Sequence, residues 1–255
     1  MSTIDERRER AAAGVALHDG DAWRDGFARP RVFLQPIAAP SALGLAGFSV
    51  ATAMVALVQA GWVGHWTDMP VLGLFAMTFG GIAQFAAGMW SYKARDVVAT
   101  VAHGMWGSFW IAFGLLQIFT ITGKLPAPVP GASNSALGLW FLGLAYMTGI
   151  AALAATFENL GIGAVLWTLT AGSVLSTIGW FTGGIGSSAL GAGGILFVVS
   201  AGLAAYMVLA MSLVAMTGRT ILPLGHYKRD ANKPGATPVE PIQLAWAEPG
   251  IKKGQ

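Results

Sequence analysis

The sequence has no cysteine, which excludes disulfides and thiolate metal sites. Charge is also scarce, because Asp, Glu, Lys and Arg make up only 11% of the 255 residues, against about 25% in a typical soluble domain. Hydrophobic residues account for 55% of the chain, and the mean hydropathy is +0.61. This composition excludes an ordinary soluble domain and indicates a membrane protein.

The charges that are present gather in the two terminal segments. Between positions 32 and 218 the charged residues are Asp68, Lys93, Arg95, Asp96, Lys124 and Glu158. The net charge of +3 therefore forms no basic stripe along a helix or a groove. Nucleic acid is excluded as a partner on this ground.

Long apolar runs fill the middle of the sequence. A membrane-spanning helix needs about 20 mostly apolar residues, and six stretches qualify, approximately 41–63, 71–90, 98–121, 135–157, 161–181 and 190–217. The predicted fold is all-α, with a polar tail at 1–35, a six-helix transmembrane domain at 36–225 and a second polar tail at 226–255. The first tail lacks the apolar run of a secretory signal, so we expect it to be retained.

The basic residues predict the orientation. With both ends in the cytoplasm, every Lys and Arg except Lys124 lies on the cytoplasmic side. Cytoplasmic loops carry an excess of Lys and Arg. The sequence therefore predicts a multi-pass protein of the inner membrane, in contact with lipid, with both termini cytoplasmic.

Ionisable residues inside the apolar runs are nearly absent, although such residues usually mark functional sites. His103 stands about two turns into the third run, either as a neutral histidine bonded to a neighbouring helix or as a group that contacts substrate or handles protons. There is no phosphate loop, no nucleophile with a base and no cluster of metal ligands. The sequence therefore predicts no enzyme, cofactor or metal. Neutral polar residues are frequent instead, and collectively they suit a path for a small polar solute. They are Ser49, Thr52, Thr78, Gln84, Ser108, Gln117, Thr148, Thr170, Ser173 and Thr177.

Four collinear motifs span residues 40–225. These are Pro40–Phe48 (PSALGLAGF), Gly80–Trp90 (GGIAQFAAGMW), Gly107–Trp110 (GSFW) and Gly218–Gly225 (GRTILPLG). They resemble the signature motifs of the acetate uptake transporter family, including its opening NPAPLGL. The chain departs from the family pattern at Ala39, Ala42 and Ser91, where an asparagine, a proline and an acid are usual.

The resemblance implies a homohexamer with one path per protomer and a narrow apolar constriction within that path. The constriction residues correspond to Phe48, Trp106 and Leu169, and Trp106 stands where tyrosine is common. Polar contacts along the path are predicted at Ser41, Gln84, His103, Ser108 and Thr170. The small residues Gly44, Gly47, Gly80, Gly81, Ala87 and Gly88 permit close helix contacts, either within or between protomers.

The predicted function is transport of a small monocarboxylate such as acetate, as a channel or with protons as co-substrate. Two alternatives stay open. One is a path for ammonia or another small neutral solute, and the other is a membrane scaffold or sensor that works through its tails. The Gly218–Gly225 turn, including Arg219, is predicted to anchor the end of the last helix.

Overall fold

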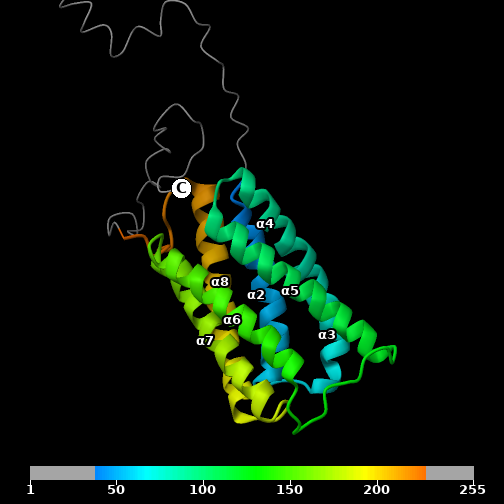
Figure 1. Ribbon diagram of the computed structural model, residues 1–255. Helices are drawn as coiled ribbons and strands as arrows, with labels where there is room; N and C mark the ends of the chain where they lie inside the picture. The colour runs from blue at the N-terminus through cyan, green and yellow to red at the C-terminus, as the bar shows by residue number, and fades with distance from the viewer. Residues whose placement is uncertain (1–37, 228–255) are drawn as a thin grey trace, which may run out of the picture. The chain divides into compact units, whose positions relative to one another are not determined.

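A computed structural model describes residues 38–227, and every regular element in that range is a helix. The predicted tail at 1–35 and residues 228–255 of the predicted tail at 226–255 lie outside the described residues. Figure 1 shows the helices running side by side as an elongated bundle. The main elements are α2 (Pro40–Gln59), α3 (Met69–Ala76), η2 (Met77–Ala83), α4 (Gln84–Lys93), α5 (Val97–Ile121), α6 (Ser135–Thr156), α7 (Leu160–Thr182) and α8 (Ser188–Thr217).

The prediction of six membrane spans is confirmed for the described residues. The second span runs continuously over Trp66–Lys93 and comprises the short 3-10 helix η1 (Trp66–Asp68), α3, η2 and α4. The first span is shorter than predicted and ends at Gln59. Two glycines with positive φ, Gly61 at 73° and Gly64 at 74°, follow it and turn the chain.

Short polar residues start four of the helices. The side chains of Asp96, Asn134, Asn159 and Ser187 each accept a hydrogen bond from the amide three residues later. These bonds satisfy amides that have no partner inside the helix. Pro40 starts α2 at a position where no amide hydrogen is needed.

The middle of the second span is π-helical over Met77–Ala83, the segment that carries Gly80 and Gly81. A side chain cannot be added at Gly80 without a clash, because a Cβ there would lie 2.5 Å from both Ala51 Cβ and Trp110 Cδ1. Short π-helical segments occur mainly at functional sites. This one brings α2, the second span and α5 into close contact and sets the position of Gln84 just after it.

The six spans form a ring. Along it, α6 packs on α7, α7 on α8, α8 on α2, α2 on the second span, and the second span on α5, with a sparser contact between α5 and α6. We call the end where α2 begins and α8 ends the tail end, and the opposite end the loop end. Figure 1 shows the tail end at the top and the loop end at the bottom.

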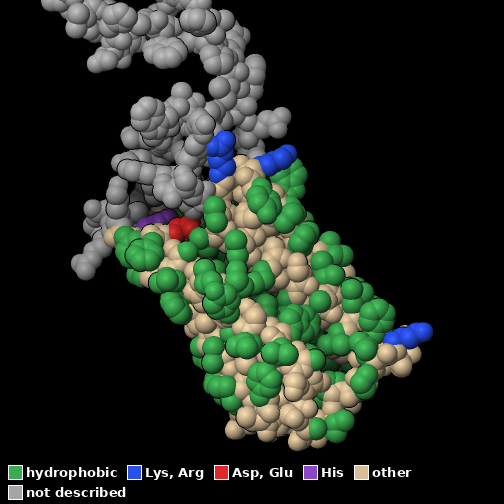
Figure 2. Space-filling model, in the orientation of Figure 1, with side chains coloured by type: hydrophobic (Ala, Val, Ile, Leu, Met, Phe, Trp, Pro, Cys, Tyr) green, Lys and Arg blue, Asp and Glu red, His purple; other side chains and the backbone are tan. Residues whose placement is uncertain are grey.

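The outer surface of the bundle is apolar. Large hydrophobic side chains such as Val71, Phe75, Leu153 and Leu209 are exposed, and the face shown in Figure 2 has its Lys and Arg side chains only at the two ends. An apolar band between two charged ends is what a lipid bilayer requires of a spanning protein. The described chain is a multi-pass membrane protein.

The Gly218–Gly225 turn folds back onto the bundle. Gly218 ends α8 in the left-handed conformation at φ 67°. The Leu160 amide at the start of α7 donates to the Gly225 carbonyl at 2.8 Å, and the Tyr206 hydroxyl donates to the Pro223 carbonyl at 2.8 Å. The turn thus ties the end of α8 to the start of α7; the particular contribution of Arg219 stays a prediction.

Candidate functional site

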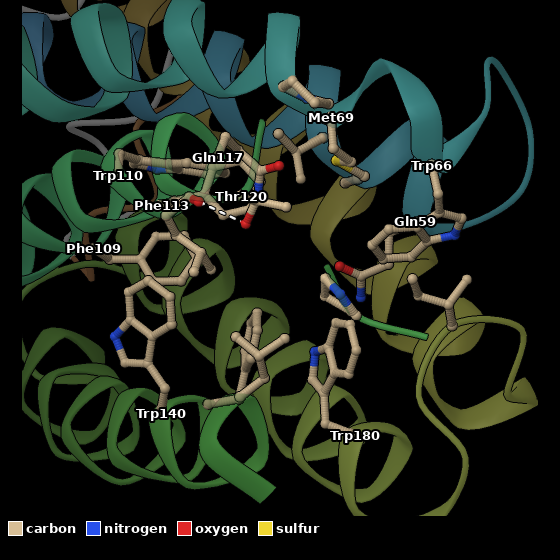
Figure 3. Close-up of a pocket in the computed structure, with 18 of the residues that line it drawn as sticks. Gln59, Trp66, Met69, Phe109, Trp110, Phe113, Gln117, Thr120, Trp140 and Trp180 are labelled. Atoms are coloured by element: carbon tan, nitrogen blue, oxygen red, sulfur yellow. Dashed lines mark hydrogen bonds between the residues drawn. The ribbon is translucent and has the colours of Figure 1, made fainter. Parts of the chain in front are cut away.

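A cavity of about 440 Å³ opens inside the ring toward the loop end. Its wall comes from all six spans, and Figure 3 shows four of its tryptophans (Trp66, Trp110, Trp140 and Trp180) around the central space. No Asp, Glu, Lys or Arg is among the described residues that line it. Gln59, Gln117, Thr52 and Thr120 are among its neutral polar groups. This loop-end cavity is aromatic and uncharged.

A second cavity of about 400 Å³ opens toward the tail end. Its lining includes Ser41 at the start of α2, Gln84 on α4 and His103 on α5. Unlike the loop-end cavity it has acids on its wall, Asp96 and Glu158, at the starts of α5 and α7. The tail-end cavity therefore has acidic side chains on its wall at the tail end of the bundle.

Trp106 is the one described residue that lines both cavities. Phe48 and Leu169 line the tail-end cavity beside it. All three are almost completely buried, at 2%, 2% and 1% exposure for Phe48, Trp106 and Leu169. The structure thus places the three residues that the resemblance assigned to a constriction on the wall of the tail-end cavity, and Trp106 also lines the loop-end cavity.

Aromatic contacts and one hydrogen bond fix the indole of Trp106. Its ring meets Phe48 edge to face, with ring centres 6.0 Å apart, and Phe109 at 5.0 Å. Its Nε1–H donates to the Thr148 hydroxyl on α6 at 3.0 Å, between two buried side chains. This hydrogen bond joins α5 to α6, the neighbouring spans with the sparser contact.

Of the predicted polar contacts, Ser41, Gln84 and His103 lie on the tail-end cavity. The His103 ring fits there because Gly44 has no side chain: a Cβ on Gly44 would lie 2.5 Å from His103 Nδ1. Ser108 and Thr170 line neither cavity. Their hydroxyls instead donate to the carbonyls one turn earlier on their own helices, at 2.8 Å each.

Buried polar atoms without a hydrogen-bond partner are concentrated on the two cavities. Among the described residues they are Thr52 Oγ1, Gln84 Oε1, His103 Nδ1, Trp110 Nε1 and Trp180 Nε1. Gln84 and His103 line the tail-end cavity, and the other three line the loop-end cavity. Buried polar groups are nearly always paired, so each of these atoms is available to a solute or to water inside a cavity.

Sequence reasoning did not assign Trp110 or Trp180 to the path, and it counted Thr52 only among the polar residues that collectively suit one. Thr52 follows Phe48 by four residues and Trp110 follows Trp106 by four, so each lies one helical turn from a constriction residue. That spacing is the signal that would have placed both on the cavity. Trp180 has no such relation, since its position depends on how α7 packs in three dimensions.

No group of His, Asp or Glu within residues 38–227 is arranged to hold a metal ion. The described fold and its interior define a class of protein. Six membrane spans surround two cavities that a buried aromatic ring separates, which is the arrangement of a membrane channel or transporter.

The particular family follows from the sequence. Residues 28–224 match the sequence model of the GPR1/FUN34/yaaH family, and the chain belongs to this family. The resemblance to the acetate uptake transporter family is thereby confirmed. Its members are transporters and channels, not enzymes.

Two known proteins and one solved structure illustrate the likeness. The succinate-acetate/proton symporter SatP of Escherichia coli is 28% identical over 193 residues, which cover 74% of this chain and 96% of that protein. The ammonia transport outward protein 2 of Saccharomyces cerevisiae is 31% identical over 169 residues, 66% of this chain and 58% of the yeast protein. The solved structure of the bacterial acetate channel SatP superposes with a TM-score of 0.63 at 26% identity, covering 74% of this chain and all of that one.

Proposed function

We propose that this protein moves a small monocarboxylic acid such as acetate across the membrane, past the constriction of Phe48, Trp106 and Leu169. The observation that carries this proposal is the shared position of Trp106 between an aromatic, uncharged loop-end cavity and a tail-end cavity. Relatives described as a succinate-acetate/proton symporter and as an acetate channel support it.

The apolar constriction favours passage of the protonated acid. A bare carboxylate in an apolar medium is far too costly, so it takes up a proton or finds donors. If the acid has a pKa like that of a glutamate side chain, about 4.3, protonation at pH 7 costs about 3.7 kcal/mol. The acid then carries its own proton, so no relay of titratable side chains is needed through the constriction.

The polar residues of the tail-end cavity would receive the acid beyond the constriction. Ser41 lies at the start of α2, where the helix amides and the positive end of the helix dipole favour an oxygen ligand. Gln84 Oε1 has no partner among the described residues and accepts the hydrogen of a protonated acid. His103 lies on the same wall.

Ammonia is the second candidate, and one observation favours it. The uncharged loop-end cavity also admits a small neutral molecule, and yeast relatives are described as ammonia transport outward proteins 2 and 3. Ammonia passes an apolar ring without first taking up a proton. The two candidates differ in the solute and not in the path.

Flux into liposomes that contain the purified protein separates these functions. We expect labelled acetate to enter faster than in protein-free liposomes, and faster at pH 5.5 than at pH 7.5. Methylammonium flux without acetate flux would establish the ammonia path instead. Flux of neither solute would refute transport and favour a scaffold or sensor.

A further inference from the structure

The turn between α4 and α5 joins the second and third spans at the tail end, as Figure 1 shows. The second span ends at Lys93 and the third begins at Val97, so residues 94–96 lie where the apolar spans end, at the level of the lipid headgroups. Residues 38–227 contain four Lys and Arg, and two of them, Lys93 and Arg95, belong to this turn. Half of the described basic residues therefore stand at one corner of the bundle.

Arg95 has a backbone conformation that favours glycine. Its φ is 54°, and within residues 38–227 it is the only non-glycine residue with a positive φ. Its amide donates to the Tyr92 carbonyl at 3.1 Å, and the Asp96 amide donates to the Ser91 carbonyl at 3.1 Å. Glycine is the usual residue at this position of such a helix end, and it adopts a positive φ at lower cost. Backbone preference therefore does not explain a guanidinium here.

A hollow of about 430 Å³ lies beside this turn. Its wall includes Tyr92 and Arg95 from the turn and Val97 and Val101 from α5. Tyr92, Val97 and Val101 are exposed, whereas Val98 lines the tail-end cavity in the interior of the ring. The hollow therefore opens on the outside of the bundle, and we call it the outer hollow.

The hydrogen-bond donors of the outer hollow are basic and phenolic groups. The hydroxyls of Ser91 and Thr100 in its lining each donate to a carbonyl of the backbone one turn earlier, at 2.8 Å and 2.7 Å. Asp96 is the one acid among its described lining residues, and its Oδ1 accepts the amide three residues later at 2.9 Å. A ligand in the outer hollow would therefore meet the donors of Arg95 and Tyr92.

Trp90 and Lys93 flank the outer hollow on α4. The Trp90 ring is exposed, and Lys93 Nζ lies 4.6 Å from its centre, so a cation–π contact holds the ammonium group at this corner. Trp and Tyr are enriched where a membrane meets water. Two cations and two exposed aromatic rings, Trp90 and Tyr92, thus gather at headgroup level.

We infer that the outer hollow binds the phosphate of an anionic phospholipid from the leaflet at the tail end, with Arg95 as its main ligand and Lys93 as a second cation. A guanidinium donates two parallel N–H groups to phosphate oxygens, and basic pockets between spanning helices bind anionic headgroups. Val97 and Val101 lie one helical turn apart on α5 and offer an acyl chain an apolar surface. A soluble anion would leave that surface uncovered, which favours a lipid.

Lipid binding to the purified full-length protein tests this site. Delipidated protein in detergent is titrated with phosphatidylglycerol or phosphatidylcholine, and bound lipid is counted by native mass spectrometry. We expect wild type to bind phosphatidylglycerol more tightly than phosphatidylcholine. Arg95→Gly removes charge-assisted hydrogen bonds, so its phosphatidylglycerol affinity should fall about tenfold while its phosphatidylcholine affinity changes less.

The backbone at Arg95 makes this variant a sharp test. Glycine suits the φ of 54°, so we expect Arg95→Gly to melt no lower than wild type. Arg95→Asn is a second variant, because asparagine also adopts this conformation, and it should lose the same lipid preference. Lys124→Gln removes a positive charge in the loop after α5, outside the outer hollow, and should bind both lipids like wild type.

The outcomes are distinct. Loss of the phosphatidylglycerol preference in Arg95→Gly and Arg95→Asn, with the preference kept in Lys124→Gln, supports the site. An unchanged preference in folded Arg95→Gly, or equal binding of both lipids by wild type, would overturn it. Inorganic phosphate that displaces the lipid would assign the outer hollow to a soluble anion. A changed number of protein copies in Arg95→Gly, with lipid affinity unchanged, would make this face a contact between protomers and would also overturn the lipid site.

Discussion

At the scale of single residues, Trp106 is the most consequential side chain described. It is larger than the tyrosine common at this position in the family, and it separates two cavities while a hydrogen bond to Thr148 holds it in place. Under the proposed function, the size of Trp106 and its hydrogen bond to Thr148 both set the width of the passage. Each can be changed separately.

Removing the indole should widen the passage. We expect Trp106→Ala to admit butyrate and succinate that wild type excludes, because the ring loses its largest member. The cost in stability is about 3–5 kcal/mol if the site does not collapse. The measurement is liposome flux of acetate, butyrate and succinate at matched protein levels. An unchanged size profile would show that Trp106 is a packing residue.

Breaking the hydrogen bond between Trp106 and Thr148 should also widen the passage, although the indole stays in place. Thr148→Val leaves the buried Trp106 N–H without its acceptor, which costs about 1–3 kcal/mol, and frees the indole to turn. We expect a lower melting temperature and measurable butyrate flux. Thr148→Ser keeps an acceptor and should resemble wild type. Equal size profiles in Thr148→Val and Thr148→Ser would mean that the bond only stabilises the fold.

At the scale of elements, composition and motifs were sufficient for the six spans, and the constriction triplet that they named stays a prediction. They were not sufficient for the π-helical segment at Met77–Ala83, since its sequence reads as a continuous apolar helix. The sequence also left open whether the glycines make their close helix contacts within or between protomers. The structure shows Gly44, Gly80 and Gly88 packed against other helices of the same protomer, so their close contacts are internal.

The predicted polar contacts of the path show a similar limit of prediction from sequence. Ser41, Gln84 and His103 line a cavity, and each belongs to a motif or is the one ionisable group of its span. Their contact with a solute stays a prediction. Ser108 and Thr170 have the same chemistry, but their hydroxyls are bonded to their own helices. Which face of a helix points inward depends on packing, and strongly apolar spans carry little amphipathic signal to indicate it.

The tight fit at Gly80 gives an element-scale prediction. Gly80→Ala places a methyl group against Ala51 and Trp110 and should destabilise the protein by about 1–3 kcal/mol through overpacking. Gly143→Ala is the matched control, because nothing lies within 4 Å of the added Cβ, and a helical alanine is favoured over glycine. Thermal unfolding followed by size-exclusion chromatography measures both. Equal melting temperatures would show that η2 can shift to accommodate a side chain.

At the scale of the whole molecule, the absence of cysteine makes the orientation easy to test. The basic residues predict that Lys124 faces outward and that Arg10, Lys93 and Lys233 face the cytoplasm. In intact cells, an impermeant thiol reagent should label Lys124→Cys and spare cysteines at the other three positions. Labelling of Arg10→Cys or Lys233→Cys from outside would reverse the topology.

The assembly is a second prediction at this scale. The family resemblance implies a hexamer, and the exposed apolar residues of the spans provide surface for contacts between protomers as well as with lipid. Native mass measurement in nanodiscs should give six copies. A monomer as the single species in lipid would refute the hexamer without affecting the path within each protomer.

The uncharged lining of the loop-end cavity bears on the energetics of the cell. Under the proposed function, an acid that carries its own proton passes the constriction of Phe48, Trp106 and Leu169 as a neutral molecule. No charged side chain moves with it. Each molecule imported then delivers one proton to the cytoplasm and transfers no net charge across the membrane. A cell that feeds on a weak acid through such a protein would dissipate its pH gradient and leave its membrane voltage unchanged.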